Sequence, residues 1–194
     1  MSAIPAPEID PTTPLPARAL RPPVGAVWAM LVPLVLILVA DRASKAWVRA
    51  VLWEPPRTLV VAPGWLEFTP VANRGIAFGL LQESGGLLAV IAVVILGAIA
   101  LRNWRQVLSA PWLFRFALGL IGGGAFGNLV DRVELGYVAD FIRVPRIPIF
   151  QVFNVADAAI VVGTATLVLA LWRSERKAPA PSPQPAAAPE ATDS

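Results

Sequence analysis

Carboxylate, amide and basic side chains lie beside the apolar segments of this chain, in positions where they could move protons. Cysteine and histidine are both absent from its 194 residues. Their absence excludes thiol nucleophiles, Ser-His and Cys-His hydrolases, and zinc sites built on either residue. Acid–base chemistry must therefore run on carboxylates, lysines or hydroxyls. The polar residues beside the apolar segments are Asp41, Arg42, Lys45, Asn73, Arg74, Asn128, Asp131, Arg132, Asn154 and Asp157.

A pair of neighbouring carboxylates is one arrangement that this inventory allows. Two neighbouring carboxylates do not both ionise cheaply, so one keeps its proton while the other stays charged. The ionised carboxylate can take a proton from a water molecule as that water attacks a carbonyl carbon, and the protonated one can donate to the carbonyl oxygen. Such a site needs no covalent intermediate.

Four apolar stretches must position these residues, at 24–41, 85–101, 112–130 and 155–172. The chain is 56% hydrophobic and 15% charged, with a mean hydropathy of +0.65, which is too apolar for a water-soluble domain of ordinary composition. At ~1.5 Å per residue, each stretch crosses most of a ~30 Å hydrocarbon core with help from its flanks. The sequence therefore predicts an all-α membrane protein with four transmembrane helices over residues 24–176.

Proline-rich segments flank the predicted membrane domain. Residues 1–23 hold several prolines together with Glu8 and Asp10, so they do not form the basic and then apolar segment of a cleavable signal peptide. Residues 177–194 are rich in proline and alanine and have no apolar face to bury. We expect both tails to be disordered.

Successive helices must alternate in direction, which brings the polar residues to one membrane face. The end of the first span, the start of the second, the end of the third and the start of the fourth all meet there. Four spans also place both termini on one side of the membrane, and lysines and arginines at the termini and in the central loop favour the cytoplasmic side. The two other loops carry arginines as well, so the charge rule alone leaves the orientation open.

Spacing along the predicted helices pairs several of the polar residues. Asp41 and Lys45 lie at positions i and i+4 of one helical face, while Asn128 precedes Asp131 by three residues, as Asn154 precedes Asp157. These spacings predict polar partners for each carboxylate on its own helix.

Glycines recur along the third predicted span. Gly119, Gly123 and Gly127 form two overlapping GxxxG patterns, which permit close approach of helix backbones. We expect this packing to bring the end of the third span within reach of the fourth.

The longer loops at residues 53–84 and 132–154 contain β-branched and aromatic runs such as TLVVAPGWLEF. These runs are typical of short strands. We therefore expect a small extracytoplasmic β-rich region that rests on the bilayer surface.

Five blocks of sequence, in order and spacing, resemble the signature motifs of bacterial lipoprotein signal peptidases. They are DRASK, NRGIAF, GGGAFGNLVDR, YVADF and FNVAD, which begin at Asp41, Asn73, Gly122, Tyr137 and Phe153. The resemblance spans the four predicted helices, and its departures are Ser44 for a frequent threonine, Ile76 for a small residue and Ala139 for a frequent valine.

This resemblance implies an aspartic endopeptidase of the bacterial inner membrane that cleaves prolipoproteins before a diacylglyceryl-modified cysteine, near the outer face. The aspartates of YVADF and FNVAD, which are Asp140 and Asp157 here, correspond to the catalytic pair. The matching residues that contact substrate or hold the site together are Asp41, Lys45, Asn73, Gly75, Asn128, Asp131, Arg132 and Asn154.

Without the resemblance, the sequence does not choose between Asp131 and Asp140 as the partner of Asp157. Asp131 is followed by Arg132, and an adjacent Asp and Arg more often form a structural ion pair that keeps the carboxylate charged. This consideration favours Asp140. A surface role for Asp140 would be favoured if its loop stood away from the bilayer.

Other classes of function fit the residues less well. Ser44 and Lys45 diverge by about 100° around a helix and do not form a hydrolase dyad. A small ion- or proton-coupled transporter, the main alternative, needs polar groups across the whole bilayer. A scaffolding subunit would leave the gathering of charges unexplained. We expect lipid-modified prolipoprotein substrates and membrane lipid as partners, a monomer, and no cofactor, metal or nucleic acid.

Overall fold

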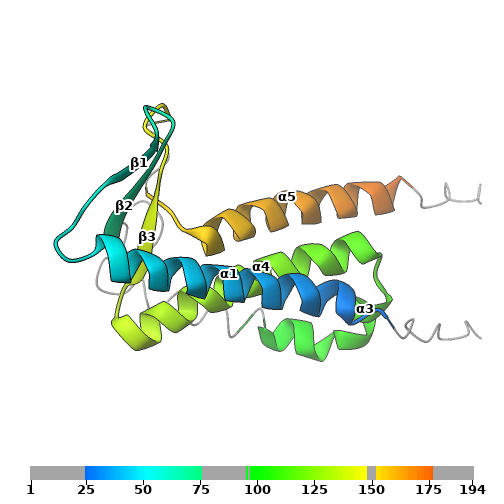
Figure 1. Ribbon diagram of the computed structural model, residues 1–194. Helices are drawn as coiled ribbons and strands as arrows, with labels where there is room; N and C mark the ends of the chain where they lie inside the picture. The colour runs from blue at the N-terminus through cyan, green and yellow to red at the C-terminus, as the bar shows by residue number, and fades with distance from the viewer. Residues whose placement is uncertain (1–24, 76–94, 96, 148–151, 177–194) are drawn as a thin grey trace, which may run out of the picture.

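Three long helices lie side by side and a small antiparallel sheet crosses one end of them in the computed structural model (Figure 1). The structure describes residues 25–75, 95, 97–147 and 152–176. Its elements are α1 (Trp28–Leu52), β1 (Leu59–Ala62), β2 (Leu66–Asn73), α3 (Trp104–Ser109), α4 (Trp112–Leu135), β3 (Val138–Arg143) and α5 (Val155–Glu175).

The helix ends show how the bundle is oriented relative to the sheet. The start of α1 and the end of α5 lie at one end of the bundle, and the sheet lies at the other (Figure 1). The end of α1, the end of α4 and the start of α5 therefore meet beneath the sheet, as the alternation of helix directions predicts.

The first helix continues well past the apolar stretch that predicts it. Its 25 residues span about 37 Å at ~1.5 Å per residue, longer than a ~30 Å hydrocarbon core. The extension beyond Ala40 carries Asp41 and Lys45, both fully buried, and ends on a small apolar core of Val48, Leu52 and Phe141 beneath the sheet. The extension thus joins the helical bundle to the sheet.

Glycines of α4 let its backbone touch both neighbouring helices. A Cβ on Gly123 would lie 2.7 Å from the carbonyl oxygen of Leu34 in α1, and one on Gly124 would press on the carbonyl oxygen of Ala156 in α5. A Cβ on Gly127 would lie 2.6 Å from Asp41 Oδ2. The expected close packing is confirmed, and α4 makes it with two partners.

The sheet has the strand order β1-β2-β3, and all of its pairings are antiparallel. Val71 of β2 stands opposite Asp140 of β3, and Asn73 stands opposite Val138. Phe153 forms an isolated bridge with Ile142, so the residues that lead into α5 are held against β3. This connection brings the end of the sheet to the start of α5.

Burial is inverted relative to a water-soluble protein. Asp41, Lys45 and Asp131 are fully buried, whereas Leu36 on α1 and Val161 on α5 are more than 60% exposed. Two of the described helices, α4 and α5, are long and apolar enough to cross a membrane. Outward-facing aliphatic side chains around a polar interior are the pattern expected where lipid replaces water.

The predicted elements are confirmed in part. The third and fourth predicted spans begin at the first residues of α4 and α5 but end five and three residues earlier than these helices. The first predicted span, 24–41, is shorter than α1, which runs on to Leu52. The prediction did not include α3. The second predicted span and both tails lie largely or wholly outside the described residues, although residues 97–102 are helical. The expected β-rich region is present as β1, β2 and β3.

Candidate active site

Asp140 is held at the centre of β3, with both carboxylate oxygens bonded to amides. It is 1% exposed. Asn73, from β2, donates to Asp140 Oδ2 at 2.8 Å, and Asn154 donates to Oδ1 at 2.7 Å. The sequence predicts that Asp140 lies in a loop that forms short strands, and Asp140 lies in a strand whose first four residues are buried. A surface role for this carboxylate is thereby excluded.

Asp157 belongs to the first turn of α5 and takes part in a reciprocal helix cap. The backbone N–H of Asp157 donates to Asn154 Oδ1 at 2.9 Å, and the backbone N–H of Asn154 donates to Asp157 Oδ2 at 3.2 Å. This capping box satisfies donors that a helix start otherwise leaves free. It also fixes the direction in which the Asp157 carboxylate points.

Two asparagine side chains connect the two aspartates. Asn128 of α4 donates to Asp157 Oδ1 at 2.7 Å. Asn154 donates both to Asn128 Oδ1, at 3.0 Å, and to Asp140 Oδ1. A continuous path of hydrogen bonds thus runs from Asp140 through Asn154 and Asn128 to Asp157.

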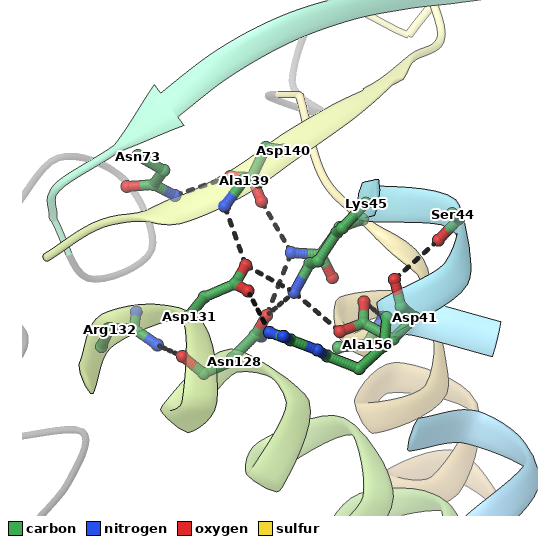
Figure 2. A network of polar contacts seen from close by, with 12 residues as sticks. Asp41, Ser44, Lys45, Asn73, Asn128, Asp131, Arg132, Ala139, Asp140 and Ala156 are labelled. Carbon is green, nitrogen blue, oxygen red and sulfur yellow. Dashed lines mark hydrogen bonds and ion pairs between the residues drawn. The ribbon is translucent and has the colours of Figure 1, made fainter. Parts of the chain in front are cut away.

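Lys45 lies at the base of this path, between two further carboxylates (Figure 2). Its Nζ is 2.8 Å from Asp41 Oδ2 and 3.0 Å from Asp131 Oδ2, and it donates to Asn128 Oδ1 at 3.1 Å. The ion pair of Asp41 with Lys45 that the spacing predicts is confirmed. An ammonium has three N–H groups, and here it has three oxygen neighbours.

Each carboxylate beside Lys45 also holds the backbone next to one of the paired aspartates. Asp41 Oδ1 accepts from the N–H of Ala156, at 3.1 Å, and Asp131 Oδ2 accepts from the N–H of Ala139, at 3.1 Å. Ala156 precedes Asp157, and Ala139 precedes Asp140. Lys45 therefore links the backbone supports of both aspartates.

The surroundings of Asp140 change its protonation. Burial and the charge of Asp157 raise the pKa of Asp140 to about 7 from its ordinary value of 3.8, against the opposing effect of the hydrogen bonds from Asn73 and Asn154. Near neutral pH, this carboxyl group therefore exchanges a proton. Asp140 can thus act as an acid beside a second carboxylate.

Asp131 has a different electrostatic environment, dominated by cations of α1. Its Oδ1 lies 3.5 Å from Arg42 Nη1 and 4.0 Å from Arg49 Nη1, in addition to the contact of Oδ2 with Lys45. The cations that surround Asp131 thus come from α1 and not from its neighbour Arg132.

Arg132 joins the site to the residues after β2. Its guanidinium donates to the backbone oxygens of Asn128, at 3.3 Å, and Gly75, at 3.5 Å. The N–H of Gly75 in turn donates to Asn73 Oδ1 at 3.0 Å, which orients the Asn73 amide toward Asp140. The expected ion pair of Asp131 with its neighbour Arg132 is replaced by these backbone contacts.

The ten site residues that the resemblance implies are brought together in one network: Asp41, Lys45, Asn73, Gly75, Asn128, Asp131, Arg132, Asp140, Asn154 and Asp157. One pairing was wrong: Asn128 donates across to Asp157 rather than to Asp131 on its own helix. The sequence reasoning also missed the roles of Arg42 and Arg49. Their spacing with Lys45, three and then four residues apart, places all three on one helical face and could have revealed them.

The chain is similar to known proteins along most of its length. Residues 33–173 match the family model described as Signal peptidase (SPase) II. Proteins named lipoprotein signal peptidase are similar to this chain. That of Syntrophomonas wolfei is 41% identical over 147 residues, covering 74% of this chain and 95% of its own. That of Caulobacter vibrioides is 40% identical over 150 residues, covering 76% and 89%.

Solved structures share the fold. A bacterial membrane enzyme determined at 2.3 Å resolution by the in meso method superposes with a TM-score of 0.67 at 24% sequence identity, covering 83% of this chain and 96% of that one. A second, determined at 1.9 Å resolution, gives a TM-score of 0.64, also at 24% identity, over 78% and 95% of the two chains. The helices with outward-facing aliphatic side chains thus belong to a membrane enzyme fold, and the transporter hypothesis finds no support.

Proposed function

The chain belongs to the signal peptidase II family, and from this premise we propose that Asp140 and Asp157 are the catalytic pair of an aspartic endopeptidase. The protein is a membrane protease that removes signal peptides from prolipoproteins. The observation that carries the proposal is the amide-bridged pair itself, in which Asp140 titrates near neutral pH beside a second carboxylate.

The proposed reaction uses a water molecule as the nucleophile. One aspartate is ionised and takes a proton from the water, whose oxygen attacks the carbonyl carbon of the scissile peptide bond. The other aspartate, which is protonated, donates its proton to the carbonyl oxygen. The tetrahedral intermediate then collapses as the leaving nitrogen receives a proton from the first aspartate and the second recovers its own. Both groups return to their starting states.

The surrounding residues support this chemistry without taking part in proton transfer. Asn73 and Asn154 hold the Asp140 carboxyl group, and Asn128 holds that of Asp157. Asp41, Lys45 and Asp131 fix the backbone beside both aspartates. We infer that Arg132 and Gly75 line the space that the substrate enters, beside Asn73.

We propose that the scissile bond precedes a diacylglyceryl-modified cysteine and lies near the outer face of the bacterial inner membrane. The extension of α1 beyond the hydrocarbon thickness lifts the site to the level of a membrane surface. Both termini then lie on the cytoplasmic side, since the start of α1 and the end of α5 lie at the end of the bundle opposite the sheet. The protease acts as a monomer with membrane lipid around it, without a cofactor.

Replacement of each aspartate by asparagine tests the pair. Asp140→Asn and Asp157→Asn are each expected to abolish cleavage of a lipidated preprotein while the purified protein keeps its thermal transition. Glu134→Gln is a matched control, because Glu134 is a half-exposed carboxylate that pairs with Arg42 at the surface. Near-normal cleavage by either aspartate variant would exclude the proposed pair.

The substrate assignment has its own test. The same preprotein should be offered with and without the diacylglyceryl group on its cysteine, and we expect cleavage of the lipidated form alone. Equal cleavage of both forms would show that the enzyme recognises the peptide and not the lipid.

A further inference from the structure

We propose that Lys45 acts on Asp157 through the side-chain amide of Asn128, so that Asp157 is the general base and Asp140 the general acid. This inference rests on the proposed catalytic pair and assigns different tasks to its members. Lys45 is a positioning residue in this scheme, since its ammonium acts through another side chain.

Two donors fix the orientation of the Asn128 amide, the ammonium of Lys45 and the side-chain amide of Asn154, and the ammonium is the charged one. The ammonium donates to Asn128 Oδ1, so the amide nitrogen must face the other way, toward Asp157 Oδ1. A flipped amide would set its NH₂ group against the ammonium and its oxygen against the carboxylate, and both contacts would be repulsive. Lys45 thereby ensures that Asp157 receives an N–H donor at 2.7 Å.

The same contact strengthens the donor. A cation at the oxygen of an amide draws electron density from its nitrogen, so that its N–H groups bind an anion more strongly. Among the described residues, the oxygens of the amides that serve Asp140 accept from neutral backbone N–H groups and have no cation beside them. The oxygen of Asn73 accepts from Gly75, and that of Asn154 accepts from Asp157.

The secondary structure adds a second difference between the aspartates. Asp157 lies in the first turn of α5, where the helix dipole stabilises a negative charge. Asp140 lies in a buried strand that offers no such field. Burial with a charged neighbour favours the protonated form of Asp140, whose pKa of about 7 agrees with a resting acid.

Other charged groups also act on the pair. Arg132 of α4 interacts electrostatically with Asp157, Asp140 and Asp131, and Lys45 opposes the rise in the Asp140 pKa as the smallest of its causes. Asp41 and Asp131 flank Lys45 and offset its charge at longer range. The directed contact through Asn128 therefore distinguishes Asp157 from Asp140 more than the net field does.

The first test removes the amide and keeps every charge. In the variant Asn128→Ala, the acidic limb of the kcat–pH profile is expected to move to higher pH by roughly one unit, because the ionised base loses its polarised donor. The alkaline limb, which reports Asp140, should remain near its wild-type position. An acidic limb that stays in place while kcat falls equally at all pH values would overturn the proposal.

The second test removes the ammonium in a charge-balanced background. The variant Asp41→Asn/Lys45→Met loses one negative and one positive charge, and Asp41→Asn alone is its matched control, because an asparagine oxygen can still accept from Ala156. We expect the acidic limb of the double variant to lie at higher pH than that of the control. Acidic limbs at the same pH in the double variant and its control would contradict the proposal. Loss of folding in both the double variant and Asn128→Ala would also contradict it, because these residues would then have a purely structural role.

These outcomes are separable from those that test the catalytic pair. If Asp140→Asn or Asp157→Asn stays active, the pair itself is wrong. If both variants are inactive and the acidic limb of the kcat–pH profile does not move in Asn128→Ala, the catalytic pair is retained and only the proposed role of Lys45 is rejected.

Discussion

Asp131 accepts a hydrogen bond of 3.1 Å from the backbone N–H of Ala139, the residue before Asp140 in β3. An aspartate that is a rival candidate for catalysis on sequence grounds is thus a support of the strand that carries the proposed catalytic one. Three cations surround Asp131, and its Oδ2 holds the backbone beside Asp140.

This relationship predicts how Asp131→Asn will fail. Asparagine can still accept from Ala139, but Lys45 and the α1 arginines lose their shared anion in a fully buried place. Removing one partner of a buried ion pair costs about 3–5 kcal/mol. Thermal unfolding in detergent should show a clearly lower transition temperature for Asp131→Asn. Asp140→Asn should lose activity without this decrease in transition temperature. Equal stability of Asp131→Asn and wild type would contradict the structural role.

The raised pKa of Asp140 predicts how stability depends on pH. The folded protein holds a proton on Asp140 up to about pH 7, while the unfolded chain releases it near 3.8. Between these values the folded state binds more protons, so this residue makes stability fall as pH rises from about 4 to about 7, with no further change above. Melting temperatures measured from pH 4 to pH 8 should show a shallower decline for Asp140→Asn than for wild type. Parallel curves would show that Asp140 titrates normally.

Gly127 offers a test of how the packing of α4 supports the site. A Cβ added there would lie 2.6 Å from Asp41 Oδ2, so Gly127→Ala must displace the carboxylate that holds Ala156. We expect a loss of about 1–3 kcal/mol in stability together with reduced kcat. Gly122→Ala is the matched control on the same helix, because its Cβ would meet Leu34 at 3.5 Å, an ordinary contact. Equal effects of the two changes would indicate a general cost of alanine and no specific role of Asp41.

Asn154 combines a helix cap with a bridge to Asp140, and two substitutions separate the roles. Serine can still cap α5 but is too short to bridge to Asp140, whereas alanine does neither. We expect Asn154→Ser to keep most of the thermal stability while losing activity, and Asn154→Ala to lose about 1 kcal/mol more. If Asn154→Ser retains full kcat, the contact of Asn154 with Asp140 is dispensable.

The sequence predicts those parts of the fold that have a local signal. Asn154 marks the start of α5 because its side chain caps the helix, and Gly119 and Gly123 mark close packing because only glycine permits it. The predicted span stops short of the end of α1, because hydropathy falls at Asp41 while the helix itself continues. Hydropathy reports contact with lipid, and a backbone can stay helical beyond the lipid when tertiary packing supports it.

The arrangement of the side chains in the site was harder to predict than the identity of the residues that form it. Their types and spacing brought ten residues to one membrane face, but the direction of each side chain depends on neighbours that are distant in sequence. Asn128 turns toward Asp157 because Lys45, 83 residues earlier, occupies its oxygen. The choice of Asp140 over Asp131 likewise depends on Arg42 and Arg49 of another helix: their spacing places them on the face of Lys45, but it does not show that this face meets Asp131.

The capping box of α5 has a consequence for inhibition. Asp157 is both a proposed catalytic group and the residue whose carboxylate closes the helix start on Asn154. A substitution there that weakened an inhibitor would abolish the proposed chemistry, and a side chain unable to accept from the N–H of Asn154 would also open the capping box. Resistance through this position is therefore closed to the enzyme, which makes the Asp157 carboxylate a durable contact for inhibitor design.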